Sequence, residues 1–189
     1  MFCASSVGGD AVYAAAVRGL AAALVQRGIG IVYGGGSVGL MGVLADTALA
    51  AGGEVIGVIP RPLARREIAH AGLSEIHVVD SMHARKAKMA SLVDGFVALP
   101  GGLGTFEETL EILTWSQLGI HRKPVGILNV AGYYDGLLQM LTHAVREGFV
   151  RREYFELLLF AETAGDVLDA ISAWTPPPLP GPWLDPSQI

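Results

Sequence analysis

Three carboxylates follow directly after a glycine-rich run, at Glu107, Glu108 and Glu111. Carboxylates are common general acids and bases. On a helix, Glu108 and Glu111 share a face at i, i+3, and Glu107 and Glu111 share one at i, i+4. Thr105 and Glu108 also fit the capping box Thr-x-x-Glu, in which the glutamate bonds to its own helix N-terminus. Glu108 therefore has two interpretations, a carboxylate over a ligand cleft or a cap.

Two glycine-rich turns each follow a predicted strand and open a predicted helix. The first contains Gly34, Gly35 and Gly36, and the second contains Gly101, Gly102 and Gly104. In this context glycines let the backbone approach an anion, and the first helical N–H groups bind phosphate. Tight strand-to-helix packing is the alternative for either turn alone. The first turn has neither the Gly-Lys-Ser/Thr of a Walker loop nor the spacing of a dinucleotide fingerprint.

A basic helix is expected between the two turns, with Asp80 or Ser81 at its N-cap. Cations near a helix N-terminus oppose the helix dipole, so Arg85 and Lys86 need another reason to be there. Both fall within the stripe Met82-Arg85-Lys86-Met89, at i, i+3, i+4, i+7. We therefore expect an anion site rather than a solvated charged face.

The elements that must position these residues alternate between short apolar runs and longer helical segments, which is typical of an α/β fold. The pattern predicts a Rossmann-like, doubly wound, mainly parallel sheet of about seven strands, with both turns at the carboxyl ends of strands, where such sheets bind ligands. The strands are expected at 2–4, 29–33, 54–59, 75–79, 96–99, 125–129 and 157–160, and the helices at 10–27, 40–51, 82–93, 105–118, 134–147 and 164–174.

Composition limits the class of protein. The chain has 189 residues, 51% of them hydrophobic, and a net charge of −5, which argues against binding a nucleic-acid polymer. We expect one domain over 1–175 and a proline-rich tail over 176–189. No apolar stretch is long enough for a membrane span. A lone cysteine, Cys3, suits a reducing compartment, so the cytoplasm is the expected location.

No cofactor is expected. The five histidines lack metal-ligand spacing, which predicts no catalytic metal. None of the three lysines has a context that suggests a pyridoxal Schiff base. Any catalysis or ligand binding is therefore expected to depend on the carboxylates, the cations and the two glycine turns.

Four motifs occur together in this chain: YGGGSVGLMG at 33–42, MHARKAKM at 82–89, PGGLGTFEE at 100–108 and TWSQLGIHRKPVGILN at 114–129. The third fits the pattern PGGxGTxxE. Over residues 2–174 the chain resembles the LOG family, the cytokinin riboside 5′-monophosphate phosphoribohydrolases, whose members are often labelled possible lysine decarboxylases. The resemblance implies a Rossmann-like homodimer that hydrolyses the N-glycosidic bond of a cytokinin riboside 5′-monophosphate, or of AMP, to free base and ribose 5-phosphate.

The resemblance also implies roles for individual residues. Glu108 would stabilise the sugar cation and orient or deprotonate water, and Arg85 would contact the phosphate or the departing purine. Lys86 would help to hold the ligand, and Glu67 and Thr114 fall where the family contacts substrate. The segment of the second turn would surround the 5′-phosphate and ribose, through Gly101, Gly102, Leu103, Gly104, Thr105, Phe106 and Glu107.

The chain departs from the family at its start, where Ala4 replaces the glycine of the usual CGSS. The extra methyl is expected to narrow the cleft, so the resemblance does not predict which base is preferred. The loop 61–72 is a plausible lid. A non-catalytic nucleotide-binding or carrier protein of the same fold is the competing hypothesis, and Glu108→Gln would leave its affinity nearly unchanged. The predicted helices 82–93 and 105–118 are the candidate dimer interface.

Overall fold

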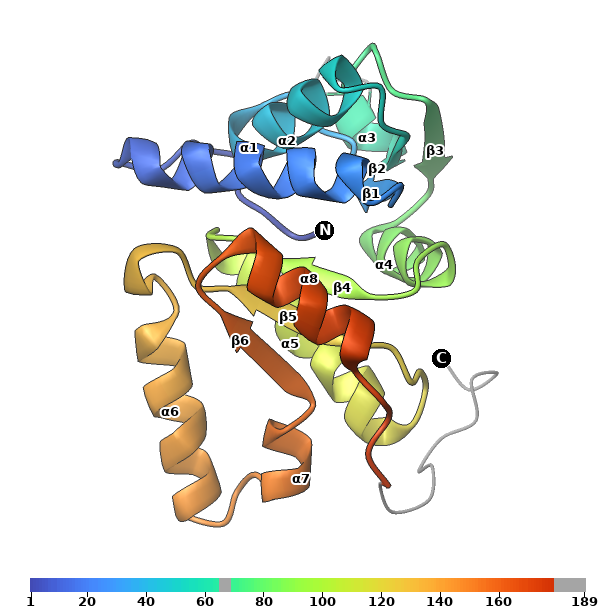
Figure 1. The fold of residues 1–189 in the computed structure, drawn as a ribbon. Helices are drawn as coiled ribbons and strands as arrows, with labels where there is room; N and C mark the ends of the chain where they lie inside the picture. The colour runs from blue at the N-terminus through green and yellow to red at the C-terminus, as the bar shows by residue number, and fades with distance from the viewer. Residues whose placement is uncertain (65–68, 179–189) are drawn as a thin grey trace. The chain divides into compact units, whose positions relative to one another are not determined.

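The computed structural model describes residues 1–64 and 69–178 and divides the chain into two compact units, Met1–Val93 and Asp94–Ile189 (Figure 1). Each unit contains a three-stranded parallel sheet and the helices connected to it. All pairings between the named strands are parallel, as the sequence predicts. The α/β class is therefore confirmed.

The first unit has the strand order β1-β2-β3. Its register pairs Ile31 with Val55 and Gly57 with Ile76. Helices α1 and α2 pack against each other, and their facing side chains, among them Leu20 and Leu44, are fully buried. The elements are α1 (Ala11–Gln26), β1 (Ile31–Tyr33), α2 (Gly39–Ala50), β2 (Val55–Pro60), α3 (Arg61–Ala64), β3 (Glu75–Val79) and α4 (Met82–Ser91).

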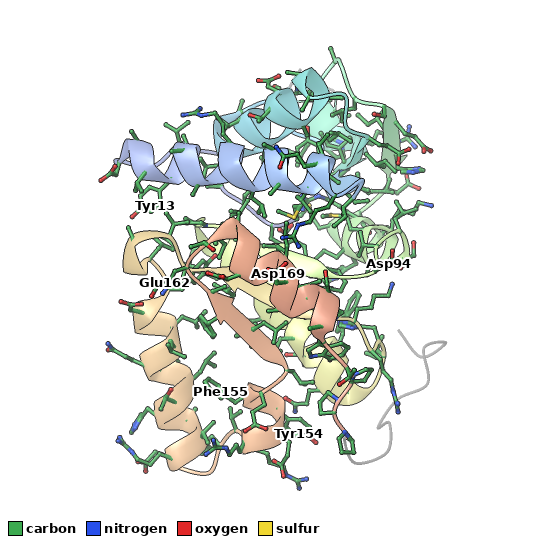
Figure 2. The ribbon with its side chains drawn as sticks, in the orientation of Figure 1. Tyr13, Asp94, Tyr154, Phe155, Glu162 and Asp169 are labelled. Carbon is green, nitrogen blue, oxygen red and sulfur yellow. The ribbon has the colours of Figure 1, made fainter. Side chains whose placement is uncertain are left out.

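The second unit has the strand order β4-β5-β6, with α8 packed against β5 and β6. Figure 2 shows Tyr154 on α7, where its ring is buried and the Arg151 guanidinium lies 6.0 Å from the ring centroid. The elements are β4 (Phe96–Ala98), α5 (Leu103–Leu118), β5 (Val125–Leu128), η1 (Val130–Gly132), α6 (Asp135–Arg146), α7 (Arg152–Phe155), β6 (Leu158–Ala161) and α8 (Ala164–Ala173).

Local sequence explains where several helices begin and end. The side chains of Asp10, Ser81 and Thr163 each accept a backbone N–H from the first turn of α1, α4 and α8. Such N-caps satisfy donors that have no acceptor within the helix. At the C-terminal end of α5, Gly119 adopts φ +82°, a left-handed conformation that glycine adopts without strain. Helix α5 therefore ends at a glycine C-cap.

The structure corrects the strand count, because residues 1–64 and 69–178 contain six strands where about seven were expected. In the predicted strand 2–4, Phe2 alone makes a bridge. The backbone then turns, and the carbonyls of Ala4 and Ser6 accept N–H groups of α2 instead of pairing with a strand. Helices α3 and α7, of four residues each, were not predicted. They are too short to show helical periodicity.

Among the helices described, none combines the length and apolarity that crossing a membrane requires. After α8, residues 174–178 have no regular secondary structure. The rest of the proline-rich tail, residues 179–189, lies outside the described residues. The domain boundary at 175/176 stays a prediction.

Candidate functional site

Helix α4 buries two cations. Arg85 is 9% exposed and Lys86 is 4% exposed, and Met89 is buried beside them, whereas Met82 is exposed. The stripe predicted from the sequence therefore does place its cations on the buried face, and the solvated-face alternative is wrong. Removing a charge from water costs free energy unless polar partners compensate it. One such partner is the backbone carbonyl of Val58, within β2, which accepts a hydrogen bond from Arg85 Nε at 3.1 Å.

The Arg85 guanidinium also lies against the backbone of Gly34, the first residue after β1. A Cβ atom at Gly34 would overlap Arg85 Nη2 and would lie 3.3 Å from Arg85 Cζ and 3.3 Å from Met41 Sδ. Gly34 is not among the residues of positive φ, so its backbone conformation does not require glycine. A glycine is needed because the guanidinium leaves no room for a Cβ atom. The first glycine turn therefore helps to position the side chain of Arg85.

The rest of the first turn packs closely on β2. Gly35 adopts φ +73°, and a Cβ there would lie 3.3 Å from Ile59 Cβ and 3.5 Å from Gly57 Cα. The hydroxyl of buried Tyr33 donates to the carbonyl of Gly36 at 3.0 Å. Burial is the main cause that raises the pKa of Tyr33 far above its usual value, with smaller contributions from Cys3 and Asp46. The Tyr33 hydroxyl therefore stays protonated at physiological pH and acts as a hydrogen-bond donor.

The helix that follows the first turn already has acceptors for its leading N–H groups. Leu40 donates to the carbonyl of Ser6 at 3.1 Å, and Met41 donates to the carbonyl of Ala4 at 3.3 Å. A Cβ at Gly39 would overlap the backbone of Ser5 and Ser6, so the N-terminal segment lies directly on this helix end. These donors are consequently engaged by protein rather than by an anion. Gly34, Gly35 and Gly36 stay predicted ligand contacts.

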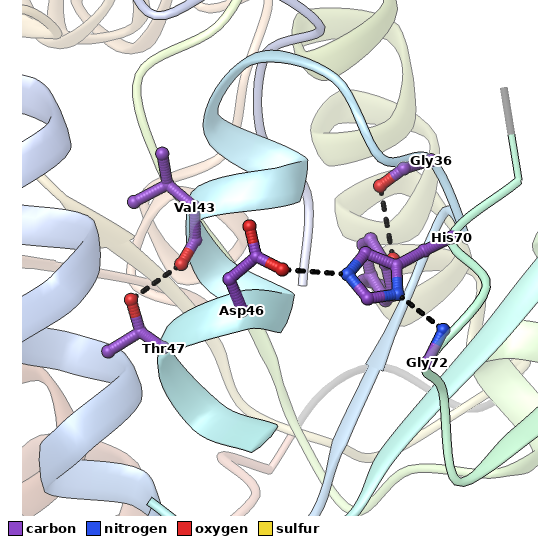
Figure 3. A network of polar contacts seen from close by, with 7 residues as sticks. Gly36, Val43, Asp46, Thr47, His70 and Gly72 are labelled. Carbon is purple, nitrogen blue, oxygen red and sulfur yellow. Dashed lines mark hydrogen bonds and ion pairs between the residues drawn. The ribbon is translucent and has the colours of Figure 1, made fainter. Parts of the chain in front are cut away.

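A polar network connects the segment after residue 68 to the first turn and to α2 (Figure 3). Ala69 bridges to Gly36, and His70 N–H donates to the carbonyl of Gly35 at 2.9 Å. His70 Nδ1 accepts from Gly72 N–H at 3.1 Å, which leaves Nε2 to donate to Asp46 at 2.9 Å. This network gives His70 a structural role. Glu67, a predicted substrate contact, lies outside the described residues.

The second turn differs from the first at its helix end. Helix α5 begins at Leu103 after Gly102, which is the N-cap and has no side chain to cap the helix. The leading N–H groups of a helix have no intrahelical acceptor. Leu103 is 85% exposed, whereas Thr105 is buried and lies so close to Gly101 that a Cβ there would overlap it. The second turn thus meets the steric and donor requirements of a phosphate-binding turn better than the first.

Glu108 is 7% exposed and lies on the buried face of α5, beside Thr105 and Thr109. Because the N-cap is Gly102, Thr105 is three residues inside the helix, and the capping-box interpretation of Glu108 is wrong. The other two acids have different surroundings, since Glu107 is exposed and Glu111 is half-buried. Of the three residues Glu108 is the most buried, and one carboxylate oxygen of Glu111, Oε2, is also removed from solvent.

Thr114, another predicted substrate contact, is exposed on α5 and donates its hydroxyl to the carbonyl of Leu110 at 2.7 Å. Phe106 is half-buried and contacts two tyrosines, Tyr133 and Tyr134, at ring-centroid distances of 6.3 and 6.0 Å. These tyrosines are not among the site residues predicted from the sequence. Their position after the end of β5 was the available signal, because strand ends of α/β sheets carry binding residues.

The predicted site residues therefore form one group in each unit. Arg85, Lys86 and the first turn belong to Met1–Val93, and the second turn, Glu108 and Thr114 belong to Asp94–Ile189. Within residues 1–64 and 69–178, no cluster of three or more His, Cys, Asp or Glu side chains could hold a metal ion.

Comparison with known proteins gives closely similar sequences. Residues 41–171 match the family model described as "Possible lysine decarboxylase". The chain is 51% identical, over 94% of its length and 72% of the relative's, to a probable cytokinin riboside 5′-monophosphate phosphoribohydrolase of Oryza sativa subsp. japonica. It is 49% identical to a cytokinin riboside 5′-monophosphate phosphoribohydrolase of Arabidopsis thaliana, over 93% of its length and 83% of the relative's.

Solved structures share the fold at lower identity. The molybdenum cofactor binding protein of Rippkaea orientalis has a TM-score of 0.65 and 21% identity, covering 87% of this chain and 88% of that one. The molybdenum cofactor carrier protein of Chlamydomonas reinhardtii has a TM-score of 0.64 and 22% identity, with 91% of each chain covered. These two similarities support the Rossmann-like architecture.

Proposed function

This chain belongs to the LOG family of cytokinin riboside 5′-monophosphate phosphoribohydrolases, and from that premise we propose that it hydrolyses the N-glycosidic bond of a cytokinin riboside 5′-monophosphate or of AMP. Water adds to the ribose C1′, and the base leaves with the bonding electron pair and a proton. The products are the free base and ribose 5-phosphate. The observation that carries the proposal is 49–51% identity over 93–94% of the chain to proteins named for this reaction.

Glu108 is proposed as the catalytic carboxylate. Breaking the bond develops oxocarbenium-like positive charge on the ribose, which a nearby carboxylate stabilises. The burial of Glu108 supports this role, because charge–charge attraction is stronger where water is excluded. In the same position Glu108 would orient or deprotonate the attacking water.

The second glycine turn and the basic residues of α4 are proposed to hold the rest of the ligand. The N-terminus of α5, with Gly102 as a side-chain-free N-cap, suits the 5′-phosphate. Arg85 is proposed to contact the phosphate or the departing purine, and Lys86 to add to the binding of the anion. Guanidinium and ammonium groups both bind phosphate well, and burial strengthens that interaction.

The test is chromatographic. The protein and its Glu108→Gln variant are incubated with isopentenyladenosine monophosphate and with AMP, and free base and ribose 5-phosphate are quantified. We expect the wild type to release base from at least one nucleotide and Glu108→Gln to turn over at least about a hundredfold more slowly. Glu153→Gln is the matched control, because it makes the same chemical change at an exposed position on α7 and should retain wild-type turnover.

Two outcomes would contradict the proposal. If neither the wild type nor Glu108→Gln released base while both bound AMP, the protein would be a nucleotide-binding or carrier protein. If the wild type released carbon dioxide from lysine only when pyridoxal phosphate was supplied, and left both nucleotides intact, decarboxylation would replace hydrolysis.

A homodimer is proposed as the active form, with α4 and α5 as candidate interface helices. Each helix exposes apolar side chains, Met82 on α4 and Leu103 and Leu110 on α5. Sedimentation at micromolar and nanomolar concentrations tests this proposal. The cytoplasm is the proposed compartment, because a chain with a single cysteine does not depend on an internal disulfide.

A further inference from the structure

Two adjacent tyrosines that follow β5 contact the backbone of the second glycine turn. The hydroxyl of Tyr133 donates to the carbonyl of Gly101 at 2.5 Å, and the hydroxyl of Tyr134 donates to the carbonyl of Leu99 at 2.7 Å. Both bonds span more than 30 residues of sequence. The turn is therefore held from outside its own strand and helix.

The tyrosines are themselves well fixed. Tyr134 is fully buried, and its N–H donates to the side-chain carbonyl of Asn129 at 2.7 Å, while the Asn129 amide donates to Asp135 at 2.7 Å. The rings of Tyr133 and Tyr134 meet edge to face at 5.1 Å, and Phe106 of α5 stacks on Tyr133 at 6.3 Å. The Tyr133 hydroxyl thus has a defined position, although that residue is 38% exposed.

The two hydrogen bonds have different consequences for the turn. The Gly101–Gly102 peptide is trans, so its N–H points opposite to its C=O. By binding the carbonyl of Gly101, Tyr133 directs the N–H of Gly102 to the other side of the turn. The Leu99–Pro100 peptide has no N–H at all, so the bond from Tyr134 cannot orient a donor.

A peptide between two glycines is the one most easily rotated, because neither residue has a Cβ to restrict its dihedral angles. Nothing in the Gly101–Gly102 pair itself selects one orientation of this peptide. The contact of Thr105 with Gly101 restricts the turn from the α5 side. The hydroxyl of Tyr133 restricts the carbonyl directly.

We infer that Tyr133 is a positioning residue for phosphate recognition, which orients the Gly102 N–H toward the 5′-phosphate, and that Tyr134 is a structural support of the same turn. This inference rests on the proposed function, because it concerns how the proposed phosphate-binding turn is prepared. Tyr133 acts through the backbone of Gly101 and need not touch the substrate.

The test compares Tyr133→Phe with Tyr134→Phe, which remove one hydroxyl each and keep the rings. For Tyr133→Phe we expect the KM for isopentenyladenosine monophosphate and the inhibition constant of ribose 5-phosphate both to rise about tenfold, the effect of losing one charge-assisted hydrogen bond. Its kcat should stay within about threefold of wild type, because the carboxylate chemistry is unchanged. Inhibition by the free base, which has no phosphate, should be unaltered.

Tyr134→Phe should lower the unfolding temperature more than Tyr133→Phe does, because its hydroxyl is the more buried of the two. Its inhibition constants for ribose 5-phosphate and for free base should change by the same small factor. If Tyr133 has only a structural role, Tyr133→Phe should also change the inhibition constants of ribose 5-phosphate and of free base by the same small factor.

The inference is overturned if Tyr133→Phe binds ribose 5-phosphate as the wild type does, or if its binding of free base weakens equally. In either case the wild-type turnover, measured in the same series, still supports the proposed function. If the wild type neither hydrolyses the nucleotide nor binds ribose 5-phosphate, the proposed function fails first, and the inference fails with it.

Discussion

Replacing Gly34 by alanine should remove Arg85 from its position while leaving the fold intact. The added Cβ would lie well within 3.0 Å of Arg85 Nη2, closer than real Cβ atoms approach, and 3.3 Å from Cζ. The guanidinium would have to retreat by about 1 Å, a displacement that costs on the order of 10²-fold in rate at a catalytic group. That loss corresponds to about 2.7 kcal/mol of transition-state stabilisation.

The stability of Gly34→Ala should change little. The atom that the new Cβ meets most closely is the end of a flexible side chain, and Gly34 does not adopt a positive φ that alanine would resist. Urea unfolding checks this expectation. Gly19→Ala on α1 is the control, because nothing lies within 4 Å of its added Cβ; it should keep wild-type turnover and gain about 0.5–1 kcal/mol of stability from helix propensity.

A double-mutant cycle with Arg85→Lys shows whether Gly34 acts through Arg85. A lysine lacks the planar fork of the guanidinium, so Arg85→Lys alone should lose about 10²-fold in kcat/KM. If the effect of Gly34→Ala is displacement of the guanidinium, adding Arg85→Lys to it should cost no more than about threefold. Multiplied losses, near 10⁴-fold, would refute this reasoning, as would a Gly34→Ala protein with wild-type turnover.

Three further predictions concern stability and assembly. The pKa of His121 is lowered, mainly by burial and further by the charge of Lys123, although the hydrogen bond of His121 to the Ile112 carbonyl acts in the opposite direction. As the pH falls, His121 of the unfolded chain therefore takes up its proton before His121 of the folded chain does. The free energy of unfolding should keep the full contribution of neutral His121 above about pH 6.5 and decrease as the pH drops below that value. His121→Gln should flatten this decrease in urea titrations, and identical pH dependence of the wild type and the variant would contradict this cause. Ser81→Ala should cost about 1 kcal/mol by removing the cap of α4, which accepts Ala84 N–H at 3.0 Å, and an unchanged urea midpoint would argue against it. Leu110→Asp should shift sedimentation toward a monomer if α5 forms the dimer interface, whereas an unchanged sedimentation coefficient would place the interface elsewhere.

The alternation of short apolar runs with longer helical segments was sufficient to place most of the strands. The strand 75–79 was predicted with its observed bounds, and five of the other strands were predicted to within two residues at each end. The stripe of α4 correctly indicated that Arg85 and Lys86 are buried. The two cations lie on the same helix face as the apolar residues of the repeat, and that is the face a helix packs against its neighbours. Periodicity also gave the α/β class.

The sequence was insufficient where a long-range contact or a helix boundary decides the local structure. The segment 2–4 has the composition of a strand, but its carbonyls at Ala4 and Ser6 bind α2, which ends the pairing. Thr105 and Glu108 have the spacing of a capping box, but the N-cap of α5 is Gly102, three residues before Thr105. Propensity and spacing describe neighbours along the chain, and both errors come from contacts or boundaries that spacing does not fix.

The two glycine turns show how one sequence pattern can serve different physical needs. In the first, the space left by missing Cβ atoms is filled by Arg85 and by β2, and the leading N–H groups of α2 bind the carbonyls of residues 4 and 6. In the second, the N-cap has no side chain and the carbonyls of residues 99 and 101 are held by tyrosine hydroxyls. Glycine content alone does not distinguish them, since what matters is which donors remain for a ligand. By that criterion the first turn positions the guanidinium of Arg85, whereas the second turn leaves backbone N–H donors for a ligand.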